Sequence, residues 1–194
     1  MKKPLIVIFL ILLLDQTSKI LVKTTMAIGE AIPVFGKWFY ILFVENNGMA
    51  FGWELSEASW GKIFLGVFRI VAVVFLFWLL HYLVKKKVKD GPIVGLSLIT
   101  AGALGNIIDG MFYGMIFGYA GFMQGRVVDM LYFPLFTFPQ WVPFLGGEIF
   151  FSPIFNIADS AITIGIIYMI IFQWNFIKNF ESIIGVEKQH GEKN

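Results

Sequence analysis

Four long apolar segments constrain this sequence more than any other feature. They cover residues 4–22, 63–84, 92–109 and 153–174. A bilayer core is about 30 Å thick and a helix rises about 1.5 Å per residue, so roughly 20 apolar residues cross it. Only 14% of the residues are charged, whereas soluble domains average about 25%. We therefore predict an all-α integral membrane protein with four transmembrane helices, folded as one domain over residues 1–194.

The first segment also has features of a secretory signal peptide, because Lys2 and Lys3 precede a run of apolar residues. No Ala-x-Ala-like cleavage site follows, and the apolar pattern continues beyond Asp15 and Lys19. We therefore interpret residues 4–22 as a retained helix. Asp15 and Lys19 are four residues apart and share a helix face. They are expected to form an ion pair that fixes the helix end or supports a nearby site.

The distribution of lysines predicts the orientation in the membrane. With four spans, one side of the membrane carries the basic residues Lys2, Lys3, the 85–89 cluster, Lys178, Lys188 and Lys193. The opposite loops carry their basic residues over a far greater length, so the positive-inside rule places both termini in the cytoplasm. The polar residues within the helices then all fall in the outer half of the membrane. This one-sided arrangement predicts a site that opens to the outer face.

Two loops on the outer side have recognisable composition. The segment 38–44 is rich in aromatic and β-branched residues, and Asn47-Gly48 after it is a strong turn signal, so a small β-hairpin is expected there. Residues 110–152 form a long loop dense in glycine, proline and aromatic residues. Because aromatic residues favour the membrane interface, we expect this loop to lie on the bilayer.

Acidic side chains inside a membrane are rare, since insertion costs about 2.5–3.5 kcal/mol each. Asp159 and Asn156 stand three residues apart in the predicted fourth helix, Asn106 and Asp109 end the third, and Asp129 lies in the outer loop. Two carboxylates in a low-dielectric site share one proton, so one can act as general base on water while the other donates a proton. From the spacing alone, a catalytic dyad, structural acids and an ion pathway all remain open.

Several classes of site are excluded or disfavoured by composition. The chain has no cysteine, which excludes disulfides, thiolate catalysis and cysteine-ligated metals. It has only two histidines, so no histidine-rich metal site and no cofactor are expected. The basic residues stand in short tracts beside apolar segments, which indicates membrane topology and not nucleic-acid binding.

Five motifs occur in order along the chain. They are Asp15-Gln-Thr-Ser-Lys19, Asn46-x-Gly48-x-Ala50-Phe51, Gly105-Asn106-Ile-Ile-Asp109, Gly125-Arg126-Val-Val-Asp129 and Phe155-Asn156-Ile-Ala-Asp159-Ser160. Together they resemble motifs of the lipoprotein signal peptidase (signal peptidase II) family, from the first span to the fourth. The resemblance implies an aspartic endopeptidase of the bacterial inner membrane. Its substrates would be prolipoproteins, cut just before a diacylglyceryl-modified cysteine.

The resemblance also implies roles for single residues. Asp129 and Asp159 match the catalytic dyad of the family, and Asp15 and Lys19 match a mainly structural pair. The residues that match substrate-binding or dyad-supporting positions are Asn46, Gly48, Asn106, Asp109, Arg126 and Asn156. Nothing in the sequence requires more than a monomer surrounded by membrane lipids.

The sequence departs from the family pattern after Asp109, where an arginine is usual and Gly110 stands here. The function of that guanidinium is either absent or supplied by Arg69 or Arg126. The separations between the acids at 109, 129 and 159 are also longer than in compact members. The additional aromatic loop is expected to cover the site as a lid or to rest on lipid headgroups.

Two other functions are compatible with buried acids. A proton- or ion-coupled transporter would use Asp15, Asp109 and Asp159 as relay groups, but a relay needs polar steps across the whole bilayer. The inner half of the predicted bundle offers none, and no repeated half of the chain is evident. In a non-catalytic assembly factor, the acids would only be neutralised by basic partners. Asparagine at 129 or 159 would then reduce stability more than activity.

Overall fold

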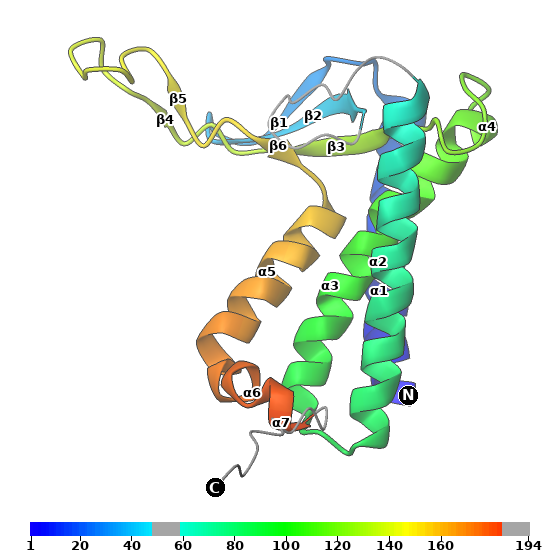
Figure 1. The fold of residues 1–194 in the computed structure, drawn as a ribbon. Helices are drawn as coiled ribbons and strands as arrows, with labels where there is room; N and C mark the ends of the chain where they lie inside the picture. Colours follow the sequence, from blue (N-terminus) through cyan, green and yellow to red (C-terminus); the bar gives the residue numbers. More distant parts are fainter. Residues whose placement is uncertain (48–58, 184–194) are drawn as a thin grey trace, which may run out of the picture.

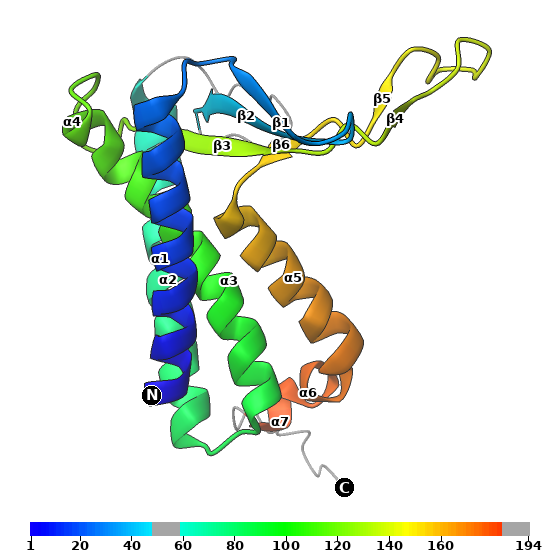
Figure 2. The same ribbon diagram turned by 180° about the vertical axis from the view of Figure 1, so that it is seen from behind.

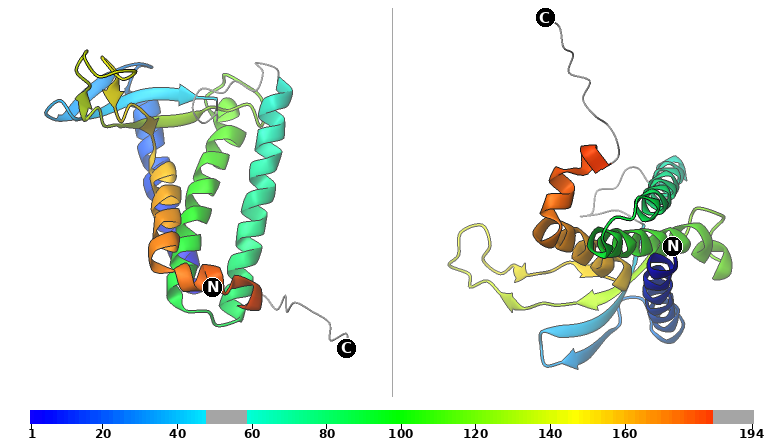
Figure 3. Two further views of the ribbon diagram at one scale, coloured as in Figure 1. Left: turned by 60° about the vertical axis from the view of Figure 1, so that its left-hand side comes forward. Right: turned by 90° about the horizontal axis from the view of Figure 1, so that it is seen from below.

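The computed structural model describes residues 1–47 and 59–183. Its main body is a bundle of four helices, α1 (Lys2–Thr25), α2 (Ser59–Lys85), α3 (Asp90–Ile108) and α5 (Ile157–Phe172). Helix α3 packs against each of the other three, and the view along the bundle in Figure 3 shows it between them. Two short helices follow, α6 (Trp174–Lys178) and α7 (Phe180–Ile183). Helices α1, α2 and α5 therefore meet at α3.

Among the described residues, three helical stretches are long and apolar enough to cross a membrane. They are Lys2–Thr25, Ile63–Lys85 and Asp90–Ile116, while Ile157–Phe172 is apolar but shorter. Large apolar side chains such as Phe9, Phe64 and Phe75 are exposed on the outside of the bundle, as expected where lipid replaces water. The helical membrane bundle is thus confirmed, whereas a crossing by the fourth helix and the orientation of the termini stay predictions.

A four-stranded antiparallel sheet covers one end of the bundle, and Figures 1 and 2 show it from both sides. Its order is β1 (Ala31–Phe35), β2 (Phe39–Asn46), β3 (Val127–Tyr132) and β6 (Ile154–Phe155). The N-terminus and α7 lie at the opposite end. Between β3 and β6, the strands β4 (Phe136–Thr137) and β5 (Ile149–Phe150) form a hairpin that projects sideways. We call residues 133–153 the aromatic arm.

The predicted β-hairpin is present as β1 and β2, whereas the turn expected at Asn47-Gly48 falls partly outside the described residues and stays a prediction. The structure joins β1 to β2 through residues 36–38, where Gly36 has a φ of +49° that glycine adopts without strain. Of the predicted turn, Asn47 follows the end of β2, and Gly48 lies outside the described residues. The strand is also part of a larger sheet, because β2 pairs with β3 on its other edge.

Two predicted helix ends were wrong. The third segment does not stop at Asp109 but continues as the π-helix η1 (Asp109–Tyr113) and the short helix α4 (Gly114–Ile116). The fourth helix starts at Ile157 and not at 153, because Ile154 and Phe155 pair with β3 as strand β6. Much of the predicted 110–152 loop is therefore organised as a helix end, a sheet strand and the hairpin of the aromatic arm.

Two hydrophobic clusters hold the bundle and the sheet together. The larger lies among the helices and includes Leu80, Leu83 and Ala101. The smaller joins the C-terminal end of α1 to the sheet and includes Phe43 and Val128. The buried polar side chains of the candidate site form a layer between these two clusters.

Glycine at 102 lets α3 and α5 approach closely. A Cβ at this position would lie 2.2 Å from the carbonyl oxygen of Ala158. We expect Gly102→Ala to lower the free energy of unfolding by about 1–3 kcal/mol, because α5 must move away from α3. Thermal unfolding in detergent measures the effect. Gly110→Ala is the control, since its Cβ meets no described atom within 4 Å. Equal melting temperatures for the two variants would contradict this view of the α3–α5 contact.

Candidate active site

Asn156 is the N-cap of α5, and its side chain organises the site. Its Oδ1 accepts a hydrogen bond from the backbone N–H of Asp159 at 2.8 Å, and Asp159 Oδ2 accepts one from the backbone N–H of Asn156 at 3.2 Å. This reciprocal capping box satisfies two backbone donors that a helix start leaves without helical partners. It also fixes the Asp159 carboxylate in the first turn of α5. Asn156 therefore precedes the helix, whereas the sequence pattern predicted that it lies inside one.

The same asparagine connects α5 to strand β3. Its Nδ2 donates to Asp129 Oδ1 at 2.7 Å and to the carbonyl oxygen of Val128 at 3.3 Å. Asn46 at the end of β2 donates to the other oxygen of Asp129 at 3.2 Å. Asn46 is 83 residues from Asp129 in the sequence, and Asn156 is 27 residues from it. The pairing of β3 with β2 and β6 brings the three residues together. Asp129 and Asp159 are thus joined through one amide side chain.

Asn106 links the two acids to a buried ion cluster. Its Nδ2 donates to Asp159 Oδ1 at 2.8 Å, and its Oδ1 accepts hydrogen bonds from Asn156 at 3.1 Å and from Lys19 at 3.0 Å. Lys19 Nζ also lies 2.9 Å from Asp15 Oδ2 and 2.8 Å from an oxygen of Asp109. All three charged side chains of this cluster are fully buried.

Asp15 anchors the start of α5 to α1. Its Oδ1 accepts a hydrogen bond from the backbone N–H of Ala158 at 2.9 Å, which satisfies another donor of the first helical turn. A Cβ at Gly105 would lie 2.6 Å from Asp15 Oδ2, so glycine is needed on α3 for this approach. The predicted pair of Asp15 and Lys19 therefore positions the helix that carries Asp159.

Asp129 lies on the sheet, outside the membrane helices, and is only 4% exposed. Burial first, and then the negative charge of Asp159, raise the pKa of the Asp129 carboxyl to about 7, against the opposing effect of the hydrogen bonds from Asn46 and Asn156. Near neutral pH, this carboxyl therefore holds a proton for a substantial part of the time.

One predicted site residue, Arg126, does not contact either acid of the dyad. Arg126 pairs with Glu45 at 3.2 Å and lies over the ring of Tyr119, with its side chain 45% exposed. The sheet register explains this position, because Glu45 lies opposite Val128 on the neighbouring strand. Gly48 lies outside the described residues, so its predicted place beside the acids stays a prediction.

Gln16 and Tyr113 also belong to the site, although the sequence pattern did not predict either of them. Gln16 donates to Asp109 Oδ1 at 2.9 Å and to Asp15 Oδ2 at 3.1 Å. Its own Oε1 accepts a hydrogen bond from the buried Tyr113 hydroxyl at 3.2 Å. A polar residue beside Asp15 in an apolar segment was an available signal for Gln16, whereas Tyr113 resembled the other aromatic residues of its region.

The fold and the site together define a helical membrane protein with a buried polar layer and two linked carboxylates under a sheet. The family model for signal peptidase (SPase) II matches residues 7–175. The lipoprotein signal peptidase of Porphyromonas gingivalis is 49% identical over 184 residues, covering 84% of this chain and 79% of that protein. That of Staphylococcus haemolyticus is 36% identical over 168 residues, covering 86% and 87%. The chain belongs to the signal peptidase II family.

Solved structures agree with this assignment. A bacterial membrane enzyme determined by the in meso method at 1.9 Å is 28% identical, with a TM-score of 0.62 over 88% of this chain and 92% of that one. A second, at 2.3 Å, gives a TM-score of 0.61 and covers 100% and 96%. The chain is thus a membrane protease by family, and the transporter alternative has no support from these comparisons.

Proposed function

We propose that this chain is an aspartic endopeptidase that removes signal peptides from diacylglyceryl-modified prolipoproteins, cutting just before the lipidated cysteine. The observation that carries the proposal is the Asn156 side chain, which binds Asp129 and caps the turn that holds Asp159. Two acids held through one amide form a centre that activates water without metal or covalent intermediate. Lipoprotein signal peptidases among the relatives supply the substrate class.

In the mechanism that we propose, Asp129 is the acid and Asp159 the base. Asp159 takes a proton from water while the water oxygen bonds to the scissile carbonyl carbon, and Asp129 protonates the carbonyl oxygen. The C–N bond then breaks. The leaving amine takes the proton from Asp159, and Asp129 recovers its proton from the hydroxyl group of the intermediate. The raised pKa of Asp129 supports this division of roles.

The proposed setting is the inner membrane of a bacterium, with the site toward the outer face. The lysines of residues 85–89 and Lys2 and Lys3 lie at the bundle end opposite the sheet, in agreement with the positive-inside rule. A lipid-modified substrate would keep its acyl chains in the bilayer and present its scissile bond to the polar layer. We propose that the enzyme acts as a monomer in the membrane.

Cleavage of matched precursors tests the function. The purified protein in lipid nanodiscs is given a prolipoprotein with a diacylglyceryl-modified cysteine, or the same precursor without the lipid. We expect mass spectrometry to find a product that begins at the cysteine from the modified precursor alone. Cleavage at another bond, or equal cleavage of both precursors, would contradict the proposal.

The pH dependence of cleavage follows from the raised pKa of Asp129, which is about 7. Below that pH, Asp129 holds the proton that the carbonyl oxygen needs, and above it the proton is lost. We therefore expect kcat/KM to fall about tenfold per pH unit above roughly pH 7–8. The measurement is a pH–rate profile between pH 5 and 9 at constant ionic strength. A flat profile over this range would rule out a proton donor of this kind.

Thermal unfolding provides a control that does not depend on activity. A carboxyl group whose pKa is higher in the folded state than in the unfolded chain binds more protons when folded, so stability falls as the pH rises from about 4 to 7. Asp129→Asn removes this contribution. The melting temperature of this variant relative to that of the natural chain is therefore expected to rise as the pH increases from 5 to 8.

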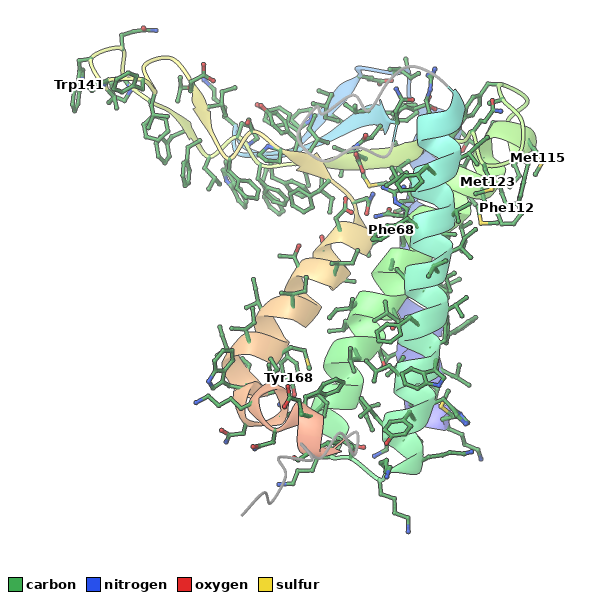
Figure 4. All side chains as sticks on the ribbon, in the orientation of Figure 1. Phe68, Phe112, Met115, Met123, Trp141 and Tyr168 are labelled. Carbon is green, nitrogen blue, oxygen red and sulfur yellow. The ribbon has the colours of Figure 1, made fainter. Side chains whose placement is uncertain are left out.

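The aromatic arm is proposed to rest on the outer surface of the bilayer. It carries one charged residue, Glu148, and several exposed apolar side chains, including Trp141 at 81% and Phe144 at 104% exposure. Figure 4 shows Trp141 at the tip of the arm, far from the bundle. Aromatic side chains of this kind are typical of the membrane interface.

Because the chain has no cysteine, a single Trp141→Cys variant can carry an environment-sensitive fluorophore. In nanodiscs we expect the fluorophore at this position to emit at shorter wavelength than the same fluorophore on a peptide in water. We also expect brominated lipids to quench its emission. Lys86→Cys, in the exposed lysine loop, is the matched control and should not be quenched. Equal behaviour of the two labels would show that the arm stands in water.

A further inference from the structure

Arg69 is a cation within the membrane stretch Ile63–Lys85 of α2, where a charged side chain is costly unless it faces protein or a polar cavity. It lines a small cavity of about 20 Å³, together with Asn106 and Gly110 of the α3–η1 region. Met123, labelled in Figure 4 beside η1 and α4, forms another wall. The cavity is thus on the side of α2 that faces the candidate active site.

The charges around Arg69 belong to that site. Asp159 and Asp109 are the carboxylates whose negative charge acts on the guanidinium, with Asp159 the stronger. Asn106 connects the cavity to the dyad, because it lines the cavity and donates to Asp159 Oδ1 at 2.8 Å. A cation at this place therefore attracts the carboxylates of the site.

Gly110 opens onto the same cavity. A Cβ built there meets no described atom within 4 Å, and the residue does not have a positive φ. A side chain at 110 would therefore start in open space at the cavity that Arg69 lines from α2. The family resemblance predicts an arginine at 110, and in this chain the arginine beside the cavity comes from the neighbouring helix.

We propose that Arg69 is a positioning residue of the dyad, which holds a positive charge beside Asp159 and Asn106 and performs from α2 the task of an arginine at position 110. The inference rests on the proposed function. The other charged groups of the site in the described part of the chain are Asp129 on β3 and the buried cluster of Asp15, Lys19 and Asp109. None of these is changed when Arg69 is replaced.

The test combines loss and relocation of the guanidinium. We expect Arg69→Gln to reduce kcat by about 10–100-fold with KM nearly unchanged. The acidic limb of the pH–rate profile, which is the fall of the rate at low pH, should move upward by about 0.5–1 pH unit. Arg69→Lys should retain most of the activity. Adding Gly110→Arg to Arg69→Gln should restore kcat to within about threefold and return the acidic limb to its original place.

Lys85→Gln, which removes a cation from the last turn of the same helix, is the control and should leave the profile unchanged. A wild-type profile in Arg69→Gln overturns the inference, and so does a folded double variant that stays as slow as the single one. If the proposed function is wrong, the natural chain itself cuts no lipid-modified precursor. If only the inference on Arg69 is wrong, the natural chain cuts the precursor normally.

Discussion

Asparagine in place of either Asp129 or Asp159 is expected to reduce kcat/KM on a lipid-modified precursor by about 1,000-fold or more. The substitution preserves size but removes the group that exchanges protons with water and with the scissile carbonyl, and general acid–base steps contribute about 10²–10⁴-fold each. The measurement is a cleavage time course over several hours, sensitive enough to detect about 0.1% of the natural rate.

The structural role of these acids is separated from the chemical one by unfolding measurements. Each aspartate accepts two N–H hydrogen bonds, and asparagine can keep one of them, so both variants should remain folded. Ser160→Ala is the neighbouring control, because it removes one hydroxyl hydrogen bond to the Asn156 carbonyl oxygen without touching either carboxylate. If the asparagine variants unfold while their remaining folded fraction cuts normally, the acids are structural and the assembly-factor alternative gains support.

Lys19→Met is expected to lower the free energy of unfolding by about 3–5 kcal/mol. The side chain is fully buried between the carboxylates of Asp15 and Asp109, at 2.9 and 2.8 Å. Methionine fills much of the volume but leaves two buried acids without their cation, and breaking a buried ion pair from one side has a cost of this size. For a chain of this length, the melting temperature should fall by roughly 10 °C.

Lys3→Met is the matched control for this prediction. Lys3 also pairs with an aspartate, Asp90, at 2.6 Å, but the two side chains are 74% and 66% exposed. Exposed pairs contribute little because water and salt screen them. Similar melting temperatures for the two variants would show that the buried cluster does not hold α1, α3 and α5 together.

The helical bundle and the residues of the site could be predicted because both depend on local pattern. Apolar stretches of about 20 residues predict membrane-spanning helices. Polar residues in such stretches are costly, so Lys19, Asn106 and Asp159 stood out without any knowledge of their partners. The contact between Lys19 and Asp109 was not foreseen, because the pattern showed only the pair with Asp15 one turn away.

The exact starts and ends could not be predicted, because they depend on distant pairing. Ile154 and Phe155 read as part of an apolar helix, yet β3 offers them strand hydrogen bonds and leaves Asn156 to begin the helix. In the same way, Arg126 stood beside Asp129 in the sequence but pairs with Glu45 on the next strand. Strand register is set by partners far along the chain, and no local pattern specifies it.

The central claim is that two carboxylates activate water for a cut before the lipidated cysteine. A single-turnover reaction in water enriched in oxygen-18, followed by mass spectrometry of the released signal peptide, tests it most directly. We predict that the peptide ends at the residue before the cysteine and carries one oxygen-18 atom in its new carboxylate after the first turnover. A first-turnover product without the label, with oxygen-18 entering Asp129 or Asp159 instead, would contradict the account by showing a covalent intermediate.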